Sequence, residues 1–343
     1  MHGFYYAAYG YMSMQGIRPQ SSFSSFSAAM SNSFKRSLKH VFKAFLLATT
    51  RNPGVNITFT GGFGAQIISS SIYHFLRQNN FNVFAEFSYF AQDTHINPGN
   101  SCDGLSQFPW QLDAFDISCE QFRSSTLSPF RALTIEDGSI KQSLFLKSMM
   151  HAPTVKFFRE KIDNYNSIGC HSASFSSGYT CVHMRRGDYL SVSSHVVSDE
   201  TYISFLSTNL VDKALPLVIL SDSPISDWFI SRVKLLGFDQ VHSIVGDSPA
   251  DAFKIMYAST ILLCSNSQFS FAAGLLSKSA TVFVPSKWFN YDTNLRHSSM
   301  AAQNLYQLDK TMQQGCSFSH WNGVLRDIQD ANINCLLRSS LSF

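Results

Sequence analysis

Two adjacent arginines, Arg185 and Arg186, are the residues of this sequence best suited to chemistry on a phosphate. They follow the apolar run Tyr179–Met184, which has the pattern of a buried strand. A guanidinium group presents a planar set of N–H donors that matches phosphate oxygens. At a strand end it can stabilise the charge that builds up on a departing diphosphate. Composition alone favours surface charges or a structural ion pair, whereas the flanking pattern favours the phosphate.

Two further residues surround this arginine pair. His183 lies two residues before Arg185, so in an extended strand both face the same side. Three roles are open for its imidazole: it orients Asp188, it contacts phosphate, or it packs in the core. We favour the last, structural role. Asp188 is either a catalytic base or the salt-bridge partner that holds the arginines. We favour the partner role, because a carboxylate tied to arginine has a lowered pKa and is a poor base.

Polar residues also follow two later apolar runs. Asp222 comes just after Leu217–Leu220 and either accepts hydrogen bonds from a nucleotide or serves as a turn or helix-capping residue. Ser265, Asn266 and Ser267 precede a predicted helix. Their side chains and the first N–H groups of that helix form a candidate phosphate cradle, and plain capping is compatible with the same pattern.

A glycine turn and several absent motifs complete the chemical signals. Gly61, Gly62 and Gly64 allow a tight turn and a close approach of backbone to a ligand, although such a turn alone is a weak signal. The sequence has no D-x-D triplet, no G-x-x-x-x-G-K-[ST] loop and no H-E-x-x-H motif. We therefore expect a transferase that relies on arginine and uses no metal or other cofactor.

The hydrophobic pattern predicts strands that alternate with helices, whereas residues 91–150 show no clear pattern. Such alternation is typical of an α/β fold with parallel, doubly wound sheets, whose ligands bind at the carboxyl ends of the strands. Polar groups follow the strands at 185–188, 221–222, 247–248 and 265–267. The predicted strands are Val55–Phe59, Val83–Phe87, Tyr179–Met184, Leu217–Leu220, Val241–Val245, Ile261–Cys264 and Thr281–Val284. The predicted helices are Gln66–Arg77, Asp199–Leu210, Trp228–Leu236, one that begins at Ser248-Pro249, and Phe269–Leu276.

Length and charge limit the class of protein. A chain of 343 residues suggests two domains. Residues 1–85 contain no Asp or Glu, whereas residues 86–343 carry 19 basic and 23 acidic side chains. A nucleic-acid binder would carry a basic surplus in its folded part, so no nucleic-acid partner is expected. The sequence contains no run of about 18 apolar residues, so it predicts no transmembrane helix.

Five segments, in order, resemble the α-1,2-fucosyltransferase family, glycosyltransferase family 11. Residues 182–189, V-H-M-R-R-G-D-Y, resemble the family motif H-x-R-R-G-D-Y, and residues 61–66, G-G-F-G-A-Q, are similar to its G-G-L-G-N-Q turn. Residues 220–222 with Trp228 resemble its S-D-(x)n-W segment. Residues 264–273, C-S-N-S-Q-F-S-F-A-A, and 284–289, V-P-S-K-W-F, resemble its S-N-S-T-F-S-W-W-A-A block and V-x-P-x-x-W-F ending.

The resemblance implies a GT-B-like fold, with two Rossmann-type domains facing across a cleft. It implies an acceptor-side domain over 55–175 and a GDP-fucose-binding domain with terminal helices over 176–343. Residues 1–54 are basic and of low complexity, with seven Ser in residues 21–34, and this composition predicts a poorly ordered segment. Arg185 or Arg186 would bind the β-phosphate, and Asp222 with residues 265–267 would lie in the nucleotide pocket. The reaction would be a metal-free, inverting transfer of fucose from GDP-fucose to a glycan acceptor, at the 2-OH of a galactose. Members of the family are Golgi membrane proteins, which implies a lumenal, membrane-associated location.

The sequence departs from the family at three positions. Ala65 stands where the family has Asn, and Phe271 and Ala272 replace its Trp pair. We expect these changes to alter the cleft, and they leave open a catalytically inactive relative that binds glycan or GDP-sugar without turnover. A different GT-B enzyme, such as one that modifies protein hydroxyls, is a further alternative.

Overall fold

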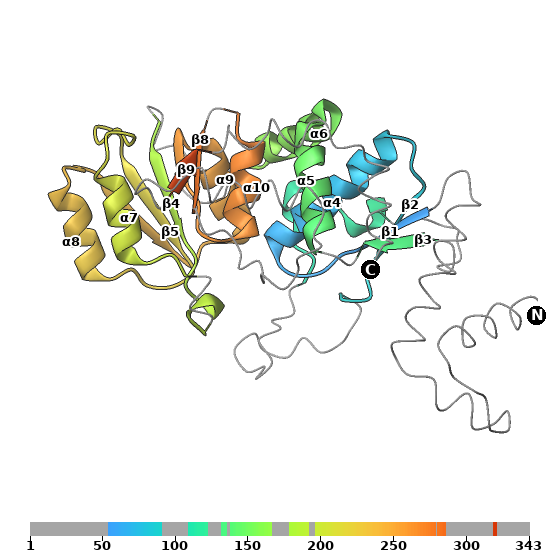
Figure 1. The fold of residues 1–343 in the computed structure, drawn as a ribbon, viewed down its shortest axis with the longest axis horizontal. Helices are drawn as coiled ribbons and strands as arrows, with labels where there is room; N and C mark the ends of the chain where they lie inside the picture. Colours follow the sequence, from blue (N-terminus) through green and yellow to red (C-terminus); the bar gives the residue numbers. More distant parts are fainter. Residues whose placement is uncertain are drawn as a thin grey trace, which may run out of the picture. The chain divides into compact units, whose positions relative to one another are not determined.

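Two β-sheets, one from each half of the chain, organise the structure, and their strands are parallel except for β9, Phe318–His320 (Figure 1). The computed structural model describes residues 54–90, 109–122, 132–135, 138–166, 178–191, 196–278, 280–285 and 318–320. Both sheets belong to one compact unit, Asn52–Phe343. The predicted segment 1–54 lies outside the described residues, apart from Gly54. The predicted division into domains at residue 175 stays a prediction.

The N-terminal sheet has three strands in the order β2-β1-β3, all parallel. The strands are β1 Gly54–Thr58, β2 Val83–Glu86 and β3 Ala132–Ile135. The helices of this half are α4 Phe63–Gln78, α5 Gly138–Met150 and α6 Ala152–Asn164, with the short 3₁₀ turns η1 Leu112–Phe115 and η2 Cys119–Phe122. β3 and α5 fall in the stretch 91–150, which has no clear hydrophobic pattern.

Helix α4 begins three residues earlier than the predicted Gln66, because the glycine turn itself forms its start. Gly62 is the N-cap, and the amide of Gln66 donates to its carbonyl. α4 packs against α5, α6 and α10 as well as the sheet, and residues on all of its sides are buried. It therefore forms the centre of the N-terminal half.

The C-terminal sheet has six strands in the order β6-β5-β4-β7-β8-β9, of which only β9 runs antiparallel. Its strands are β4 Thr180–Met184, β5 Leu217–Ser221, β6 Val241–Val245, β7 Ile261–Leu263, β8 Thr281–Pro285 and β9 Phe318–His320. The elements between them are η5 Asp188–Ser191, α7 Asp199–Leu206, α8 Asp227–Leu235, α9 Pro249–Ala258 and α10 Gln268–Leu276.

This order is doubly wound. From β4 the chain moves outward through β5 to β6, then returns to the other side of β4 with β7. Because parallel crossovers are right-handed, α7 and α8 lie on one face of the sheet and α9 and α10 on the other. β4 and β5 are buried along their whole length, as expected for parallel strands covered on both faces. The predicted α/β fold with parallel sheets is confirmed.

The start of α9 and the end of α7 are set by local hydrogen bonds. α9 begins at Pro249, with Ser248 accepting from the amide of Asp251, as the Ser-Pro pair predicted. α7 ends at Leu206, four residues before the predicted end. The hydroxyls of Ser207 and Thr208 donate to the last carbonyls of that helix, and such side-chain bonds compete with continued helix.

Candidate active site

The carboxyl ends of the central strands bring the predicted polar residues together. Met184 at the end of β4 pairs in register with Ser221 at the end of β5, and β7 pairs with the other side of β4. Arg185, Asp222 and Ser265 therefore emerge at one edge of the sheet. This edge includes the point where strand order reverses on either side of β4, which is where α/β sheets bind ligands.

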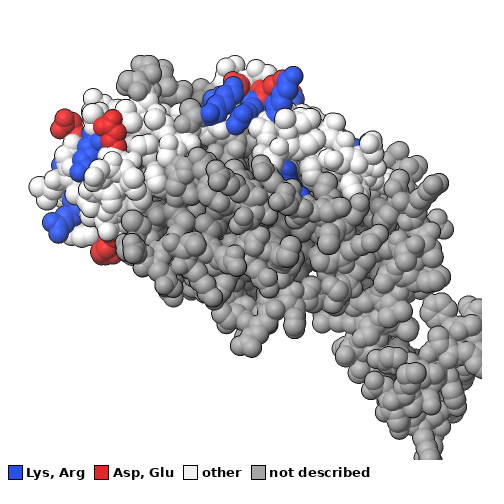
Figure 2. All heavy atoms as spheres, turned by 45° about the horizontal axis from the view of Figure 1, so that its top comes forward, with Lys and Arg blue, Asp and Glu red and all other residues white. Residues whose placement is uncertain are grey.

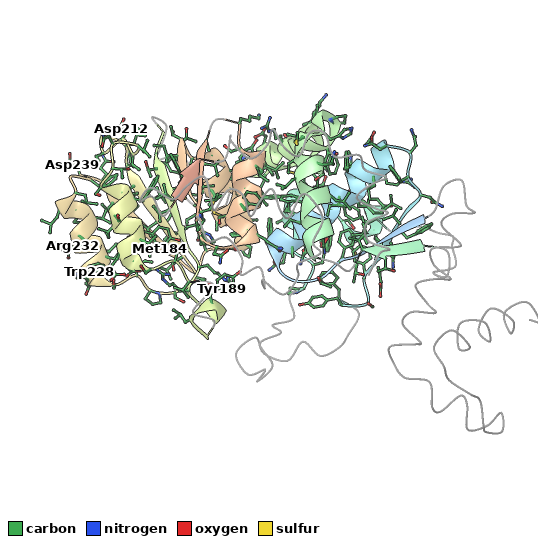
Figure 3. All side chains as sticks on the ribbon, viewed as in Figure 1. Met184, Tyr189, Asp212, Trp228, Arg232 and Asp239 are labelled. Atoms are coloured by element: carbon green, nitrogen blue, oxygen red, sulfur yellow. The ribbon has the colours of Figure 1, made fainter. Side chains whose placement is uncertain are left out.

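Arg185 faces a cavity and is held by a carboxylate and an aromatic ring. Its Nη1 lies 2.9 Å from Oδ2 of Asp222, and its guanidinium lies 5.5 Å from the ring centre of Tyr189. All three residues line the cavity, and the side chains of Arg185 and Asp222 keep 29% and 25% of their exposure. The guanidinium is thus oriented and still accessible to a ligand. Figure 3 labels Tyr189, which lies beyond the ends of β4 and β5.

Asp222 is fixed by the loop that carries the arginines. Its Oδ1 accepts from the backbone amides of Arg186, at 2.7 Å, and Gly187, at 3.1 Å. A Cβ atom at Gly187 would lie 2.8 Å from Oδ2, closer than a side chain can approach without displacing the carboxylate. Gly187 is therefore needed for this contact. Of the two roles predicted for Asp222, the structure shows neither directly, since its carboxylate binds this loop.

Arg186 has a different environment. Its Nη1 donates to the carbonyl of Val197 and its Nη2 pairs with Asp199, both at 2.5 Å, and the guanidinium lies 5.9 Å from the ring centre of Tyr202. The side chain is 11% exposed, and Arg186 is not among the described residues that line the cavity. Although the two arginines are adjacent in sequence, Arg185 faces the cavity and Arg186 binds groups outside the described cavity wall.

His183 lies beside Arg185 at the cavity, on the side predicted for it. Its Nδ1 lies 2.8 Å from the hydroxyl of Ser265, across the switch point of the sheet. Burial, reinforced by the charge of Arg185, lowers the pKa of His183 to about 3. The imidazole is therefore neutral near pH 7 and serves as a hydrogen-bonding group that ties β4 to the loop after β7.

The other predicted residues of this loop are buried at the start of α10. Ser265 and Asn266 are 2% and 1% exposed, and Ser267 caps α10 by accepting from the amide of Phe269. Ser267 also lines the cavity, whereas Ser265 and Asn266 are not among its described lining residues. The capping role is present, and a phosphate role stays a prediction. The side chain of Asp188 lies outside the described residues.

The cavity has a volume of about 550 Å³, within the range of small-molecule sites. One side is formed by the C-terminal sheet, with His183, Arg185, Asp222 and Asp247. The other side is formed by Gly61–Ala65 and Gln111 of the N-terminal half. The structure thus brings all three predicted glycines, Gly61, Gly62 and Gly64, to the same cavity as Arg185.

Two of these glycines are required by geometry. Gly61 has φ of +76°, in the left-handed region that favours glycine. At Gly64 an added Cβ would lie 2.6 Å from the backbone nitrogen of Phe269, at the start of α10. The predicted close approach of backbone at Gly64 is therefore to another helix of the protein, and it brings the starts of α4 and α10 into contact.

Helix N-termini give the cavity a positive character. α4, α9 and α10 all begin at its wall, through Gly62–Ala65, Pro249 and Ser267–Phe269. α4 has no side-chain cap and no acidic residue in its first turn. Each N-terminus carries roughly half a positive charge, and Arg185 adds a full one. The described part of the wall therefore suits an anion such as a diphosphate, with Asp222 and Asp247 as the carboxylates beside it.

Sequence reasoning missed the residue that joins the two parts of the N-terminal wall. The buried amide of Gln66 donates to the carbonyls of Gly61, at 3.0 Å, and Pro109, at 2.8 Å. Its Oε1 accepts from the amide of Gln111 at 2.8 Å. Gln66 ends the quoted G-G-F-G-A-Q segment, so the motif held the signal. Tyr189, Phe269 and Gln111 also line the cavity without having been predicted.

Residues outside the cavity have structural surroundings. Phe271 is buried and packs against Phe145, and Ala272 is fully buried, so neither is among the described lining residues. Trp228 is 45% exposed on α8, where Arg232 lies 5.9 Å from its ring centre (Figure 3). Of the three departures from the family motifs, only Ala65 lines the cavity.

Charges on the described surface form small groups of mixed sign (Figure 2). One such group joins α6 to the C-terminal half: Asp163 binds Lys278 at 2.5 Å and Tyr257 at 2.9 Å. Arg159 donates to the carbonyls of Leu276 and Ser277 at the end of α10. Within the described ranges, no group of three or more His, Cys, Asp or Glu is placed to hold a metal, and no helix is long and apolar enough to span a membrane.

Comparison with solved structures returns nucleotide-bound transferases. The chain matches POFUT1 in complex with GDP at 12% identity and a TM-score of 0.34, covering 68% of this chain and 99% of that one. It matches E. coli heptosyltransferase WaaC with ADP at 10% identity and 0.36, covering 67% and 86%. It matches Arabidopsis thaliana FUT1 in complex with GDP at 10% and 0.33, covering 74% of each. TM-scores this low add nothing to the argument, and no curated protein sequence matches the chain.

A family model matches the half of the chain that carries the arginine loop. The described residues form two α/β sheets, with a cavity lined by loops of both. The family model of glycosyl transferase family 11 matches residues 154–309, which include the C-terminal strands β4–β8 and the arginine loop. Residues 154–309 are thus similar to glycosyl transferase family 11, and the resemblance predicted from the motifs is confirmed for this part of the chain.

Proposed function

We propose that this protein is an inverting fucosyltransferase that moves L-fucose from GDP-fucose to a glycan hydroxyl, the 2-OH of a galactose. The observation that carries the proposal is Arg185, fixed by Asp222 and Tyr189 at a cavity that three helix N-termini border. Negative charge develops on the β-phosphate as the sugar leaves, and this set of positive groups is already in position to stabilise it.

The proposed step exchanges one bond for another at C1 of fucose. The acceptor oxygen forms a bond to C1 as the bond from C1 to the β-phosphate oxygen breaks. GDP leaves with that electron pair, and the proton of the acceptor hydroxyl passes to an oxygen of the leaving β-phosphate. His183 is a weak base because burial lowers its pKa to about 3, so it is not our candidate for that proton.

Asp222 has a positioning role in this proposal. It binds two backbone amides with one oxygen and Arg185 with the other, so it sets the place of the guanidinium relative to the loop. Arg186 has the same task for the loop as a whole, through Asp199 and the carbonyl of Val197. The structure therefore favours Arg185 for the phosphate, where the sequence left both arginines open.

The proposal needs no metal or other cofactor, because Arg185 and the helix N-termini supply the positive charge. We expect turnover to be unchanged by a chelator of divalent cations. A loss of turnover that added Mn²⁺ or Mg²⁺ restores would contradict this part. By family resemblance we also propose a lumenal, membrane-associated Golgi location, which imaging of the tagged full-length chain with a Golgi marker would test.

Donor binding is the direct test. The full chain and Arg185→Ala would be titrated by calorimetry with GDP-fucose, GDP-mannose and UDP-galactose. We expect binding of the guanine nucleotides, weakened by the substitution, and no binding of UDP-galactose. Folded wild-type protein that binds no guanine nucleotide would overturn the proposal.

A second candidate, a relative that binds GDP-sugar or glycan without turnover, is favoured by one observation. Ala65 lines the cavity at the position where the family motif has Asn, so the wall lacks an amide there. Enzyme-dependent fucosylated product on galactose-terminated glycans would exclude this candidate. Donor binding without product, followed by turnover in Ala65→Asn, would support it.

A further inference from the structure

The side chain of Gln66 is polar at a position where packing alone would not require a polar group. It is fully buried, and its amide nitrogen donates to the carbonyls of Gly61, at 3.0 Å, and Pro109, at 2.8 Å. Its Oε1 accepts from the backbone amide of Gln111 at 2.8 Å. A buried amide costs free energy unless it is hydrogen-bonded, whereas a methionine of similar size would fill the space without that cost. The amide group is therefore needed for its three contacts.

These contacts join two segments that are far apart in the sequence. Gly61 lies five residues before Gln66 in the chain. Pro109 and Gln111 lie 43 and 45 residues after it. Gly61 and Gln111 both line the cavity, whereas Gln66 is not among its described lining residues. One side chain behind the N-terminal wall of the cavity thus fixes both described segments of that wall.

Gln66 also restrains the glycine turn, which is the part of this wall with the most backbone freedom. Its side chain binds the carbonyl of Gly61, and its backbone amide donates to the carbonyl of Gly62 at 3.0 Å. Gly61 has φ of +76°, and glycine has fewer backbone restraints than any other residue. Because the carbonyl and the next N–H of a trans peptide point in opposite directions, fixing the carbonyl of Gly61 also fixes the amide of Gly62.

We propose that Gln66 is a positioning residue for the transfer step. The inference rests on the proposed function, in which Arg185 binds the phosphate from the C-terminal side of the cavity. Transfer needs the reacting groups held almost in contact, and a displacement of about 1 Å lowers the rate about 100-fold. Gln66 holds the opposite side of the cavity in place, so it acts on turnover. The ion pair of Arg185 with Asp222 does not involve Gln66, so GDP binding is kept without it.

Two substitutions of similar size test this role in the full chain. Gln66→Met removes all three hydrogen bonds and should lower kcat about 10- to 100-fold, with the GDP dissociation constant changed less than about threefold. Gln66→Glu puts a buried carboxyl group beside the carbonyls of Gly61 and Pro109, and such groups can have a pKa of about 8. When protonated, this carboxyl group can donate to one carbonyl and still accept from Gln111. Steady-state kinetics with GDP-fucose and calorimetry with GDP measure the two constants.

The pH profile of Gln66→Glu separates positioning from stability. All three partners of the Gln66 side chain are backbone groups, so in the wild type this network contains no group that titrates. The kcat of Gln66→Glu, divided by that of wild type at the same pH, should rise about tenfold from about pH 8 to about pH 6. Urea unfolding at each pH would show that the variant is folded in the assay, so that the ratio reports folded protein.

Ser71→Ala is the matched control. Ser71 is fully buried on the same helix, donates to the carbonyl of Ile68 and accepts from Ser148, and it is not among the described residues that line the cavity. Its substitution should lower stability and leave kcat and its pH profile unchanged.

Hydrogen exchange gives a readout that needs no turnover. The backbone amide of Gln111 loses its acceptor in Gln66→Met and should exchange about tenfold faster than in wild type. Ser71→Ala should leave this exchange unchanged.

The outcomes separate this inference from the proposed function. Wild-type kcat in both Gln66 variants, a ratio for Gln66→Glu that does not change with pH, or a loss of GDP affinity as large as the loss of kcat would overturn the positioning role alone. Wild-type protein that binds no GDP would overturn the proposed function and the inference with it. If Gln66→Met does not fold, the pH profile of Gln66→Glu decides the question by itself.

Discussion

The two arginine–carboxylate pairs at the end of β4 differ in what surrounds them. Arg185 and Asp222 line the cavity and are about a quarter exposed, whereas Arg186 is 11% exposed and lies outside the described wall. Arg186 donates to the carbonyl of Val197 and to the carboxylate of Asp199, so these donors hold the loop in place. The comparison shows that two adjacent arginines of one motif can have different tasks: one faces the cavity and the other holds the loop.

The largest expected effect separates the two arginines directly. Arg185→Ala should lower kcat about 100- to 1,000-fold, because it removes a positioned donor to the developing phosphate charge. Arg186→Ala should lower the free energy of unfolding by about 3 kcal/mol by leaving Asp199 unpaired, and its turnover per folded molecule should change much less. Steady-state kinetics with GDP-fucose and urea unfolding measure the two. Equal loss of kcat in both variants at equal stability would contradict the division.

We expect Asp222 and Asp199 to differ in the same way as the arginines that they bind, with a smaller effect on kcat. Asp222→Asn keeps an acceptor for the backbone amides but loses the charge that orients Arg185, and we expect kcat to fall about 10- to 100-fold. Asp199→Asn is the matched control, and should lower stability with little change in kcat.

A glycine provides an independent check of the same contact. Gly187→Ala leaves Asp222 in place chemically but puts a methyl group against its Oδ2, where the Cβ distance would be 2.8 Å. Its kcat should fall in the same direction as that of Asp222→Asn. A Gly187→Ala enzyme with wild-type kcat would show that the position of Asp222 does not matter for turnover.

The smallest effect concerns pH. The pKa of His183 is lowered from 6.5 to about 3 in the folded protein, chiefly by burial, so the unfolded chain binds the proton more strongly. Stability is therefore lost as pH falls from about 6.5 toward 3, by up to about 1.4 kcal/mol per pH unit for this group. Urea unfolding of wild type and His183→Asn at successive pH values should show a shallower slope in the variant. His74 and His151, whose pKa values burial also lowers, contribute the same sign in both proteins.

The strands that carry the site could be predicted because each is a short apolar run ended by polar residues. Buried β4 and β5, and the Ser-Pro start of α9, follow local rules that need no tertiary information. β3 and α5 were not predicted, and the weak amphipathic pattern of α5 left no periodic signal.

The division between the arginines was beyond the sequence. Arg185 and Arg186 are adjacent and chemically identical, and their partners Asp222 and Asp199 are 37 and 13 residues away. Which side of the loop each guanidinium faces depends on those partners. The cavity likewise depends on the packing of α4 against α10, which no local pattern encodes.

The packing of α4 against α10 depends on a close contact at Gly64. Because the starts of α4 and α10 meet where Gly64 has no side chain, the spacing between the glycine turn and the arginine side of the cavity is set by the absence of one methyl group. A larger residue at this position would push the starts of α4 and α10 apart. Gly64 therefore sets the width of the cavity where the two helix starts meet, and a larger residue there would change the distance between the glycine turn and Arg185.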